Sequence, residues 1–167
     1  MLIQKHIDGS GYFNRSWAEY KVGFGDPSGN YWIGNDRLSQ LTMTGNYKLR
    51  FDLQSRSNTN NWYWAEYSTF QVLSEANRYR LQVAGYSGNA GWDAFGYSNG
   101  GMFTTYDRDY DGRTSGNCAV LSGGGFWYGN CAYCGVNNAR GRQDGFTWER
   151  LPGGQQLQSS RMWLHCK

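Results

Sequence analysis

Hydrophobic and polar residues alternate most regularly between positions 47 and 54. Every odd position there is an apolar or aromatic residue, and every even position is charged or polar. This period of two predicts a half-buried strand with one wet face. Residues 62–73 are rich in aromatic and β-branched side chains, and residues 79–83 alternate again. Short polar turns separate the three segments, so we expect neighbouring antiparallel strands.

Two short helices are expected before this sheet. Aromatic side chains recur at spacings of three and four residues at Trp17, Tyr20 and Phe24, which is typical of one face of a helix. Asn14 has the right side chain to be its N-cap, and two glycines end it. A second helix is expected from Asn35, where two leucines share one face. These helices would cover one face of the sheet.

Both ends of the chain also have strand patterns. Residues 2–7 alternate weakly, and residues 161–165 alternate more clearly, as a last strand that returns to the sheet. Residues 85–154 lose this periodicity and hold most of the glycines and three of the four cysteines. So long a region without regular structure needs another source of order, such as a metal ion and a disulfide.

The composition is that of one folded domain. The 167 residues are 17% charged and 17% aromatic, which excludes a disordered chain. The net charge of +3 is weak and no basic stripe is present, so no nucleic-acid partner is expected. No apolar run approaches the roughly 18 residues that a membrane span needs. No secretory leader is recognisable, so we expect either that it was removed or that the chain is a fragment with an added Met.

The sharpest chemical pattern is a run of aspartates at every second position, Asp107, Asp109 and Asp111, followed by Gly112. Such carboxylates converge when the backbone curls, and hard oxygen ligands suit Ca²⁺. The run begins like an EF-hand loop, but Cys118 takes the position that requires a bidentate glutamate, and no helix pattern flanks it. The EF-hand is therefore rejected. Calcium remains the expectation, beside the alternative of a solvated acidic turn.

The cysteines are Cys118, Cys131, Cys134 and Cys166. An even number in a glycine-rich chain with few lysines is typical of an oxidising compartment. Cys131 and Cys134 form a CxxC motif, but there is no second one, so structural zinc is the weaker alternative. No helix pattern follows Cys134, which argues against a thioredoxin-type redox motif. The cysteines therefore predict disulfides in a secreted, extracellular protein.

Segments in order along nearly the whole chain resemble the fibrinogen-like (fibrinogen C-terminal) domain. One is Asp-Gly-Ser-Gly-Tyr-Phe-Asn-Arg-Ser-Trp at 8–17, and another is Phe-Trp-Tyr-Gly-Asn-Cys at 126–131. The other matching segments are 29–35, 47–53, 65–70, 79–88, 105–109 and 117–119. The family begins about 40 residues earlier, in a small N-terminal subdomain that this chain lacks.

The resemblance implies an α+β fold, with a twisted antiparallel sheet flanked by short helices and a loop-rich calcium-binding C-terminal lobe. This agrees with the fold class expected from periodicity. It divides the single domain into a central sheet subdomain, residues 1–103 and 155–167, and a loop-rich calcium and ligand-binding subdomain, residues 104–154.

The resemblance also implies the details of the calcium loop. Cys118 would pair with Cys131, and a cis peptide bond would precede Cys131. The ion would be held by the side chains of Asp109 and Asp111 and by backbone carbonyls, with Asp107 outside the first shell. The loop is one residue longer than the family pattern, so the carbonyls of Arg113 and Ser115 could give way to those of Thr114 and Gly116.

Lectin members of the family, such as ficolins and tachylectins, hold acetyl groups beside this disulfide. Their histidine after the second cysteine is Ala132 here, and the loop between Asn138 and Asp144 is several residues shorter. The acetyl pocket therefore cannot be carried over, although a cleft with other chemistry is expected, where Arg140 and Arg142 attract anionic groups or are merely solvated. The expected ligand-binding residues are Ser122, Asn130, Cys131, Ala132, Tyr133, Arg142 and Gln143.

Two cysteines remain, Cys134 and Cys166. A second bridge between them is expected. The alternatives are two free thiols or a pairing with a segment that precedes this chain.

The expected function is a secreted lectin-like pattern-recognition domain of innate immunity. Its partners would be microbial surface glycans such as peptidoglycan, lipoteichoic acid or lipopolysaccharide, and any homo-oligomer would form through segments outside this chain. The alternative is an extracellular matrix or growth-factor-like module that binds a protein receptor. Catalysis is not expected, because the clustered acids are assigned to calcium and no motif places a nucleophile beside a base.

Overall fold

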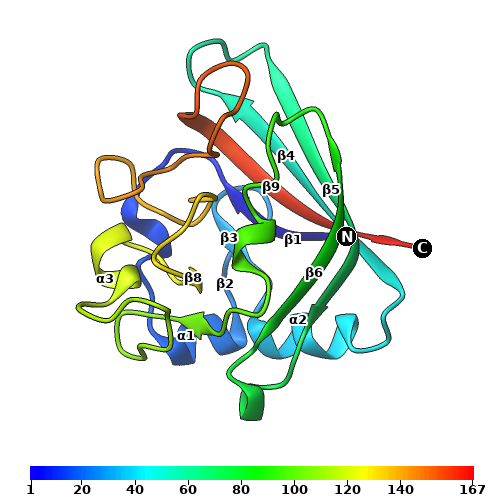
Figure 1. The fold of residues 1–167 in the computed structure, drawn as a ribbon, viewed down its shortest axis with the longest axis vertical. Helices are drawn as coiled ribbons and strands as arrows, with labels where there is room; N and C mark the ends of the chain where they lie inside the picture. The colour runs from blue at the N-terminus through cyan, green and yellow to red at the C-terminus, as the bar shows by residue number, and fades with distance from the viewer.

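A seven-stranded antiparallel sheet crosses the molecule, which is described here over residues 1–167 by a computed structural model (Figure 1). The strand order is β2-β3-β1-β9-β4-β5-β6, and every neighbouring pair is antiparallel. Its strands are β1 Leu2–His6, β2 Phe24–Gly25, β3 Tyr31–Trp32, β4 Tyr47–Ser55, β5 Trp62–Val72, β6 Leu81–Gly88 and β9 Leu157–Cys166. The expected fold class is confirmed.

The regular alternation does form a half-buried strand, β4. Its leucines and phenylalanine, Leu49, Phe51 and Leu53, are fully buried, and the polar residues between them face outward. The strand expected at 79–83 begins two residues later, at Leu81. Arg78 and Tyr79 have positive φ angles of 56° and 51°, which a strand does not accommodate.

The last strand, β9, lies in the middle of the sheet. It pairs with β4 on one side and with β1 on the other, so the two ends of the chain run side by side. Met1 N donates a hydrogen bond to Leu164 O at 2.7 Å, and Leu164 N donates to Met1 O at 2.8 Å. The two termini lie close together, on the opposite side of the molecule from α3 (Figure 1).

The helix expected after Asn14 is α1, Trp17–Val22, but its N-cap is Ser16. The Ser16 hydroxyl accepts from Glu19 N and the Glu19 carboxylate accepts from Ser16 N, which is a capping box. Asn14 instead ends a short 3₁₀ helix, η1, Gly11–Phe13. The expected N-cap was therefore wrong by two residues, because Asn14 already belongs to another turn.

The second expected helix is α2, Asn35–Thr42, which lies beside β5. The Thr42 hydroxyl accepts from Val72 N at 2.9 Å and fixes the end of the helix to the end of β5. Further 3₁₀ turns are η2, Glu75–Asn77, and η3, Gly96–Ser98. No helix in the chain is long and apolar enough to cross a membrane.

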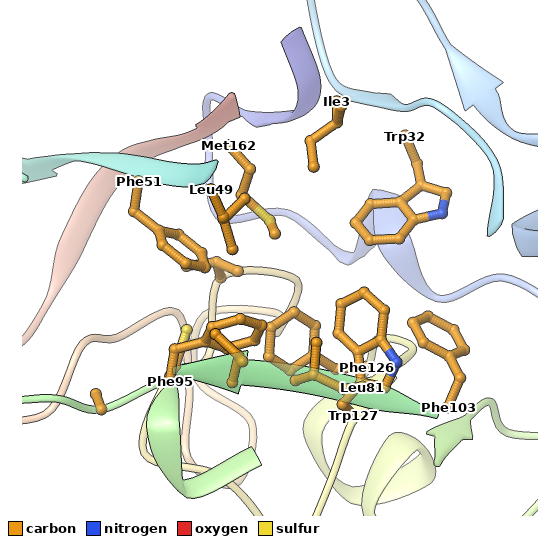
Figure 2. Packing of buried hydrophobic residues seen from close by; sticks show 14 of the residues in the cluster. Ile3, Trp32, Leu49, Phe51, Leu81, Phe95, Phe103, Phe126, Trp127 and Met162 are labelled. Atoms are coloured by element: carbon orange, nitrogen blue, oxygen red, sulfur yellow. The ribbon is translucent and has the colours of Figure 1, made fainter. Parts of the chain in front are cut away.

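Residues 85–154 contain more regular structure than their sequence predicts. They include β7 Phe103–Thr104 and β8 Phe126–Trp127, which pair with each other, and α3 Cys118–Ser122. Their aromatic side chains also face the sheet across one continuous core (Figure 2). Phe95 packs on Phe51 with ring centroids 5.0 Å apart, and Trp127 packs on Trp32 at 6.1 Å. Residues 85–154 are therefore ordered largely by aromatic packing against the sheet, and not by a disulfide alone.

Candidate functional site

One disulfide joins the start of α3 to the segment after β8. It links Cys118 to Cys131, whose Cα atoms are 5.6 Å apart and whose sequence separation is 13 residues. Closing a loop of this length stabilises a fold by about 3 kcal/mol in the chain-entropy model. The peptide bond Asn130–Cys131 is cis. Both the pairing and the cis bond implied by the family resemblance are confirmed.

Asn117 fixes the start of α3, and sequence reasoning missed it. Its Oδ1 accepts from Ala119 N at 2.8 Å and from Val120 N at 3.2 Å, which makes it the N-cap. Its Nδ2 donates to Thr105 O at 2.9 Å and so ties the helix to the segment that leads into the acidic loop. The sequence does contain the start and stop signals of this helix, because an asparagine stands just before a short apolar run that Gly123 ends.

The acidic loop brings two of its three aspartates together. Asp111 accepts from Arg113 N at 2.8 Å and from Cys118 N at 2.7 Å, and its own N–H lies 3.4 Å from Asp109 Oδ1. Burial raises the pKa of Asp111, its backbone hydrogen bonds oppose that rise, and the charge of Asp109 adds to it. Two carboxylates therefore lie side by side in a partly desolvated loop, where a bound cation would stabilise both.

Asp107 lies apart from this pair. Its Oδ1 accepts from Trp17 N at 2.9 Å and from the Thr105 hydroxyl at 2.7 Å. It therefore connects the acidic loop to the first residue of α1.

The donors of this loop fit a hard cation only if backbone oxygens complete the shell. No group of three or more His, Cys, Asp or Glu side chains anywhere in the chain is arranged to hold a metal ion. The carboxylates of Asp109 and Asp111 supply anionic oxygens of the kind that Ca²⁺ prefers. The Ser115 carbonyl, an expected ligand, accepts from Arg113 Nε at 2.6 Å. A cation at that oxygen would have to displace the guanidinium or share the carbonyl with it.

The expected ligand-binding residues divide into a buried and an exposed group. Ser122 is fully buried and Cys131 is 5% exposed, so neither side chain is open to a ligand. Ala132 is partly exposed, and the exposed members are Asn130, Tyr133, Arg142 and Gln143. Of all seven residues, only Arg142 lines a cavity.

The short loop 140–145, which holds two of the expected ligand-binding residues, is bonded to the end of α3. Gln143 N donates to Leu121 O at 3.3 Å, and its Nε2 lies 3.7 Å from Cys131 Sγ. Arg142 Nη2 donates to Val120 O at 2.7 Å. The loop is therefore held against the end of α3 and the disulfide, and Gln143 lines no cavity there.

Arg140 and Arg142 do line a shared cavity of about 240 Å³, at the edge of this loop. Arg140 is already engaged, since its guanidinium donates to Asp8 O at 2.9 Å and to Leu157 O at 2.8 Å. Burial and the nearby Arg56 lower the pKa of Arg140, and Asp8 opposes them. Arg140 therefore serves first as a link between the lobe, the N-terminal segment and the start of β9.

The expected second bridge does not form. Cys134 is a buried free thiol, and Cys166 is an exposed free thiol at the end of β9. The backbone of Cys134 is paired with that of Trp148, as in a pair of antiparallel strands. Trp148 packs on Phe51, which is opposite Met162 in β9, four residues before Cys166. Four strand residues span about 13 Å, whereas a disulfide needs Cα atoms within about 7 Å.

An exposed aromatic cluster lies beside the disulfide loop and was not predicted. Tyr133 packs between Tyr97, with ring centroids 4.6 Å apart, and Trp92, at 5.1 Å. Tyr97 is 44% exposed and Tyr133 is 42% exposed. The Arg150 guanidinium lies 5.1 Å from the centre of the Trp92 ring. We call Trp92, Tyr97 and Tyr133 the aromatic cluster.

The sequence and the fold of this chain are both matched by known proteins. The family model for "Fibrinogen beta and gamma chains, C-terminal globular domain" matches residues 1–166. The chain belongs to the fibrinogen C-terminal domain family. The fibrinogen-like globe of human ANGPTL2 superposes with a TM-score of 0.87 at 39% identity, covering 99% of this chain and 79% of that one.

Relatives of this fibrinogen-like domain include an angiopoietin-related protein and a ficolin. Human angiopoietin-related protein 2 is 42% identical over 161 residues, which cover 92% of this chain and 32% of that protein. Human ficolin-3 is 39% identical over 137 residues, which cover 82% of this chain and 45% of that protein. A lamprey fibrin D-dimer solved with the peptide ligand Gly-His-Arg-Pro-amide has a TM-score of 0.83 at 29% identity, covering 98% of this chain and 60% of that one. The chain thus spans about a third of the angiopoietin-related protein.

The comparisons correct the expected function and partners. Angiopoietin-related proteins 1 and 2 of several mammals match at 42% to 44% identity over 161 residues, which favours a receptor-binding module and not a lectin for microbial glycans. A physical reason is that neither Ala132 nor Gln143 lines a cavity in which an acetyl group could be held. The expectation of a secreted, extracellular domain is confirmed.

Proposed function

We propose that this fibrinogen-like domain is an extracellular recognition module that binds a protein receptor without catalysing a reaction. The observation that carries the proposal is the 42% identity to angiopoietin-related protein 2 over 92% of the chain. The solved lamprey relative, which holds a peptide ligand, supports a protein or peptide as the kind of partner.

The contact surface is assigned to the exposed residues around the disulfide loop. Aromatic side chains that are partly exposed and packed against each other are typical anchors of protein interfaces, and Tyr133 has this character. Asn130 and Ala132 stand in the same loop, and Gln143, next to Arg142, lies against Cys131 in that loop. Ser122 and Cys131 lie beneath the surface and hold its shape.

Calcium belongs to this proposal as a scaffold. The side chains of Asp109 and Asp111 would hold the ion, with the backbone carbonyls of Arg113 and Ser115 completing its shell. Their carboxylates lie side by side, and Asp111 is hydrogen-bonded to Cys118 N. An ion here would fix the acidic loop to the start of α3 and so stabilise the neighbouring contact surface.

The receptor proposal is tested by saturable binding of the labelled domain to cells of its own organism. Binding should be lost after the cells are treated with trypsin and should survive enzymatic removal of surface glycans. Tyr133→Ala should weaken binding by about tenfold, since truncating an aromatic hot spot costs about 1–2 kcal/mol or more. Tyr106→Ala, at a tyrosine that is 46% exposed outside the aromatic cluster, is the matched control and should bind normally. Binding that survives trypsin and is lost on glycan removal would contradict the proposal.

The calcium proposal is tested by thermal melting with Ca²⁺ and with a chelator. The wild-type domain should melt higher with Ca²⁺, because a ligand that binds only the folded state stabilises it. Asp109→Asn and Asp111→Asn should each abolish that difference. Asp26→Asn, at an exposed turn outside the loop, should preserve it. Equal calcium responses in all three variants would show that the ion binds elsewhere.

A further inference from the structure

Two neighbouring cavities meet at Met102. The first, of about 310 Å³, is lined by Tyr97, Met102, Tyr110 and Asp111 and by the backbone of several glycines. The second, of about 270 Å³, is lined by Ala76, Asn77, Arg78, Arg80 and Met102. Met102 lines both, so the two cavities adjoin at this residue, and we call them together the Met102 groove. None of the ligand-binding residues expected from the sequence lines it.

The second cavity is positively charged and its charges are uncompensated. Neither Arg78 nor Arg80 lies within 4.0 Å of a carboxylate, and both are exposed. The nearby carboxylate of Glu75 is already bound by Lys21 and by the Trp17 indole N–H. The groove therefore offers an acidic ligand two guanidinium groups that no carboxylate of the chain neutralises.

Arg78 is held in position by the fold. It stands in the left-handed region, its N–H donates to Glu75 O at 2.7 Å, and its carbonyl accepts from Phe103 N at 2.9 Å. Its guanidinium lies 4.2 Å from the centre of the Tyr110 ring, and Nη1 lies 3.8 Å from Met102 Sδ. This placement positions the charge where the two cavities meet and reduces the entropy lost when a ligand binds.

The first cavity is suited to an apolar or aromatic side chain. Tyrosine rings and the Met102 side chain supply apolar contact, and glycines at 100, 101, 112 and 129 allow close approach of another backbone. Its volume is at the lower end of the range for ligand pockets. Its one carboxylate, Asp111, is the residue assigned above to calcium, so the bound ion would neutralise it.

We propose that the Met102 groove binds an extended acidic segment of the protein partner, with an apolar or aromatic residue in the first cavity and carboxylates at Arg78 and Arg80. This proposal rests on the proposed receptor function and adds the chemistry of the segment recognised. Tyr97 connects the two surfaces, because it lines the groove and packs on Tyr133 of the aromatic cluster. A sulfated glycan would match the arginines but would leave the apolar cavity without a complementary group.

The test uses a fluorescein-labelled peptide of about ten residues in which two phenylalanines precede four glutamates. Anisotropy should report saturable binding, and replacing either the glutamates by glutamine or the phenylalanines by serine should weaken it about tenfold. Arg78→Glu combined with Arg80→Glu should weaken it by at least about tenfold. The matched control, Arg56→Glu with Lys167→Glu, makes the same change in net charge at exposed residues outside the groove and should bind normally.

Three outcomes would overturn the groove assignment: no saturable binding, equal loss in both double variants, or a heparin oligosaccharide that displaces the peptide and binds independently of the phenylalanine cavity. A failure of the groove assignment can be distinguished from a failure of the receptor proposal. If the Arg78/Arg80 variant keeps trypsin-sensitive cell binding, the groove is wrong and the receptor function stands. If cell binding is insensitive to trypsin, the receptor function fails whatever the peptide does.

Discussion

His6 is a buried base in a place that cannot easily hold a charge. Its side chain is fully buried between Phe13 and Phe146, with ring centroids 4.6 Å and 4.2 Å away. Nδ1 hydrogen-bonds to Val136 O at 2.9 Å, and burial lowers the pKa of His6 below its ordinary 6.5, although Asp8 opposes that shift. The neutral imidazole therefore joins β1 to the lobe.

This residue predicts a pH dependence of stability. The unfolded chain takes up a proton at His6 below pH 6.5 while the folded state does not, so the free energy of unfolding falls as the pH drops through that value. Urea titrations between about pH 7 and 5.5 should show that the free energy of unfolding falls less steeply in His6→Gln than in the wild type. This holds even if the substitution lowers the stability of the variant at every pH. His165→Gln, at an exposed position, should keep the wild-type decline. A wild-type slope retained in His6→Gln would contradict the assignment.

The two free thiols, Cys134 and Cys166, should differ in their reactivity. Cys166 is exposed, whereas Cys134 is fully buried and burial raises its pKa, so little thiolate forms there. A maleimide reagent should label Cys166 in the native protein and Cys134 only after denaturation, as read by mass spectrometry. Absence of labelling in both states would instead indicate that the two cysteines are bridged.

At the scale of elements, α3 depends on a single cap. Asn117→Ala should lower the free energy of unfolding by about 1–2 kcal/mol, because two N–H groups of α3 and the Thr105 carbonyl lose their partner. Asn117→Ser keeps a capping oxygen and should lose less. The measurement is urea unfolding followed by tryptophan fluorescence. Equal losses in both variants would show that the bond to Thr105, and not the cap, is what matters.

The length of each helix or strand decided whether the sequence pattern could predict it. β4 and β9 were predictable because one face is buried and the other wet, and β5 because its residues are aromatic and β-branched; these strands have nine to eleven residues. β7, β8 and α3 have two to five residues, too few for any period to be visible. The disulfide and cis bond followed from family resemblance. The closure of loop 140–145 could not be predicted, because it depends on where a shortened loop meets Leu121 and Cys131 in space.

At the scale of the whole molecule, the lobe and the sheet share their core. Trp127 is fully buried, touches side chains from both, and donates its indole N–H to Tyr79 O at 2.7 Å. Trp127→Ala should therefore destabilise the entire domain by about 3–5 kcal/mol, and unfolding should remain one transition by near-UV and far-UV circular dichroism. Trp62→Ala, at a residue that is 40% exposed, should cost under about 1 kcal/mol. Separate transitions for lobe and sheet would contradict a common core.

The pairing of the two chain ends has a consequence for presentation. Met1 and Leu164 bond to each other, and both ends lie opposite α3 and the disulfide loop (Figure 1). A tether attached at either end therefore holds the domain from the same side of the molecule. The disulfide loop and α3 then face away from the tether. Immobilisation through either end should give equal receptor affinity, and several copies on one stalk could engage a crowded membrane at once, gaining avidity without any new contact.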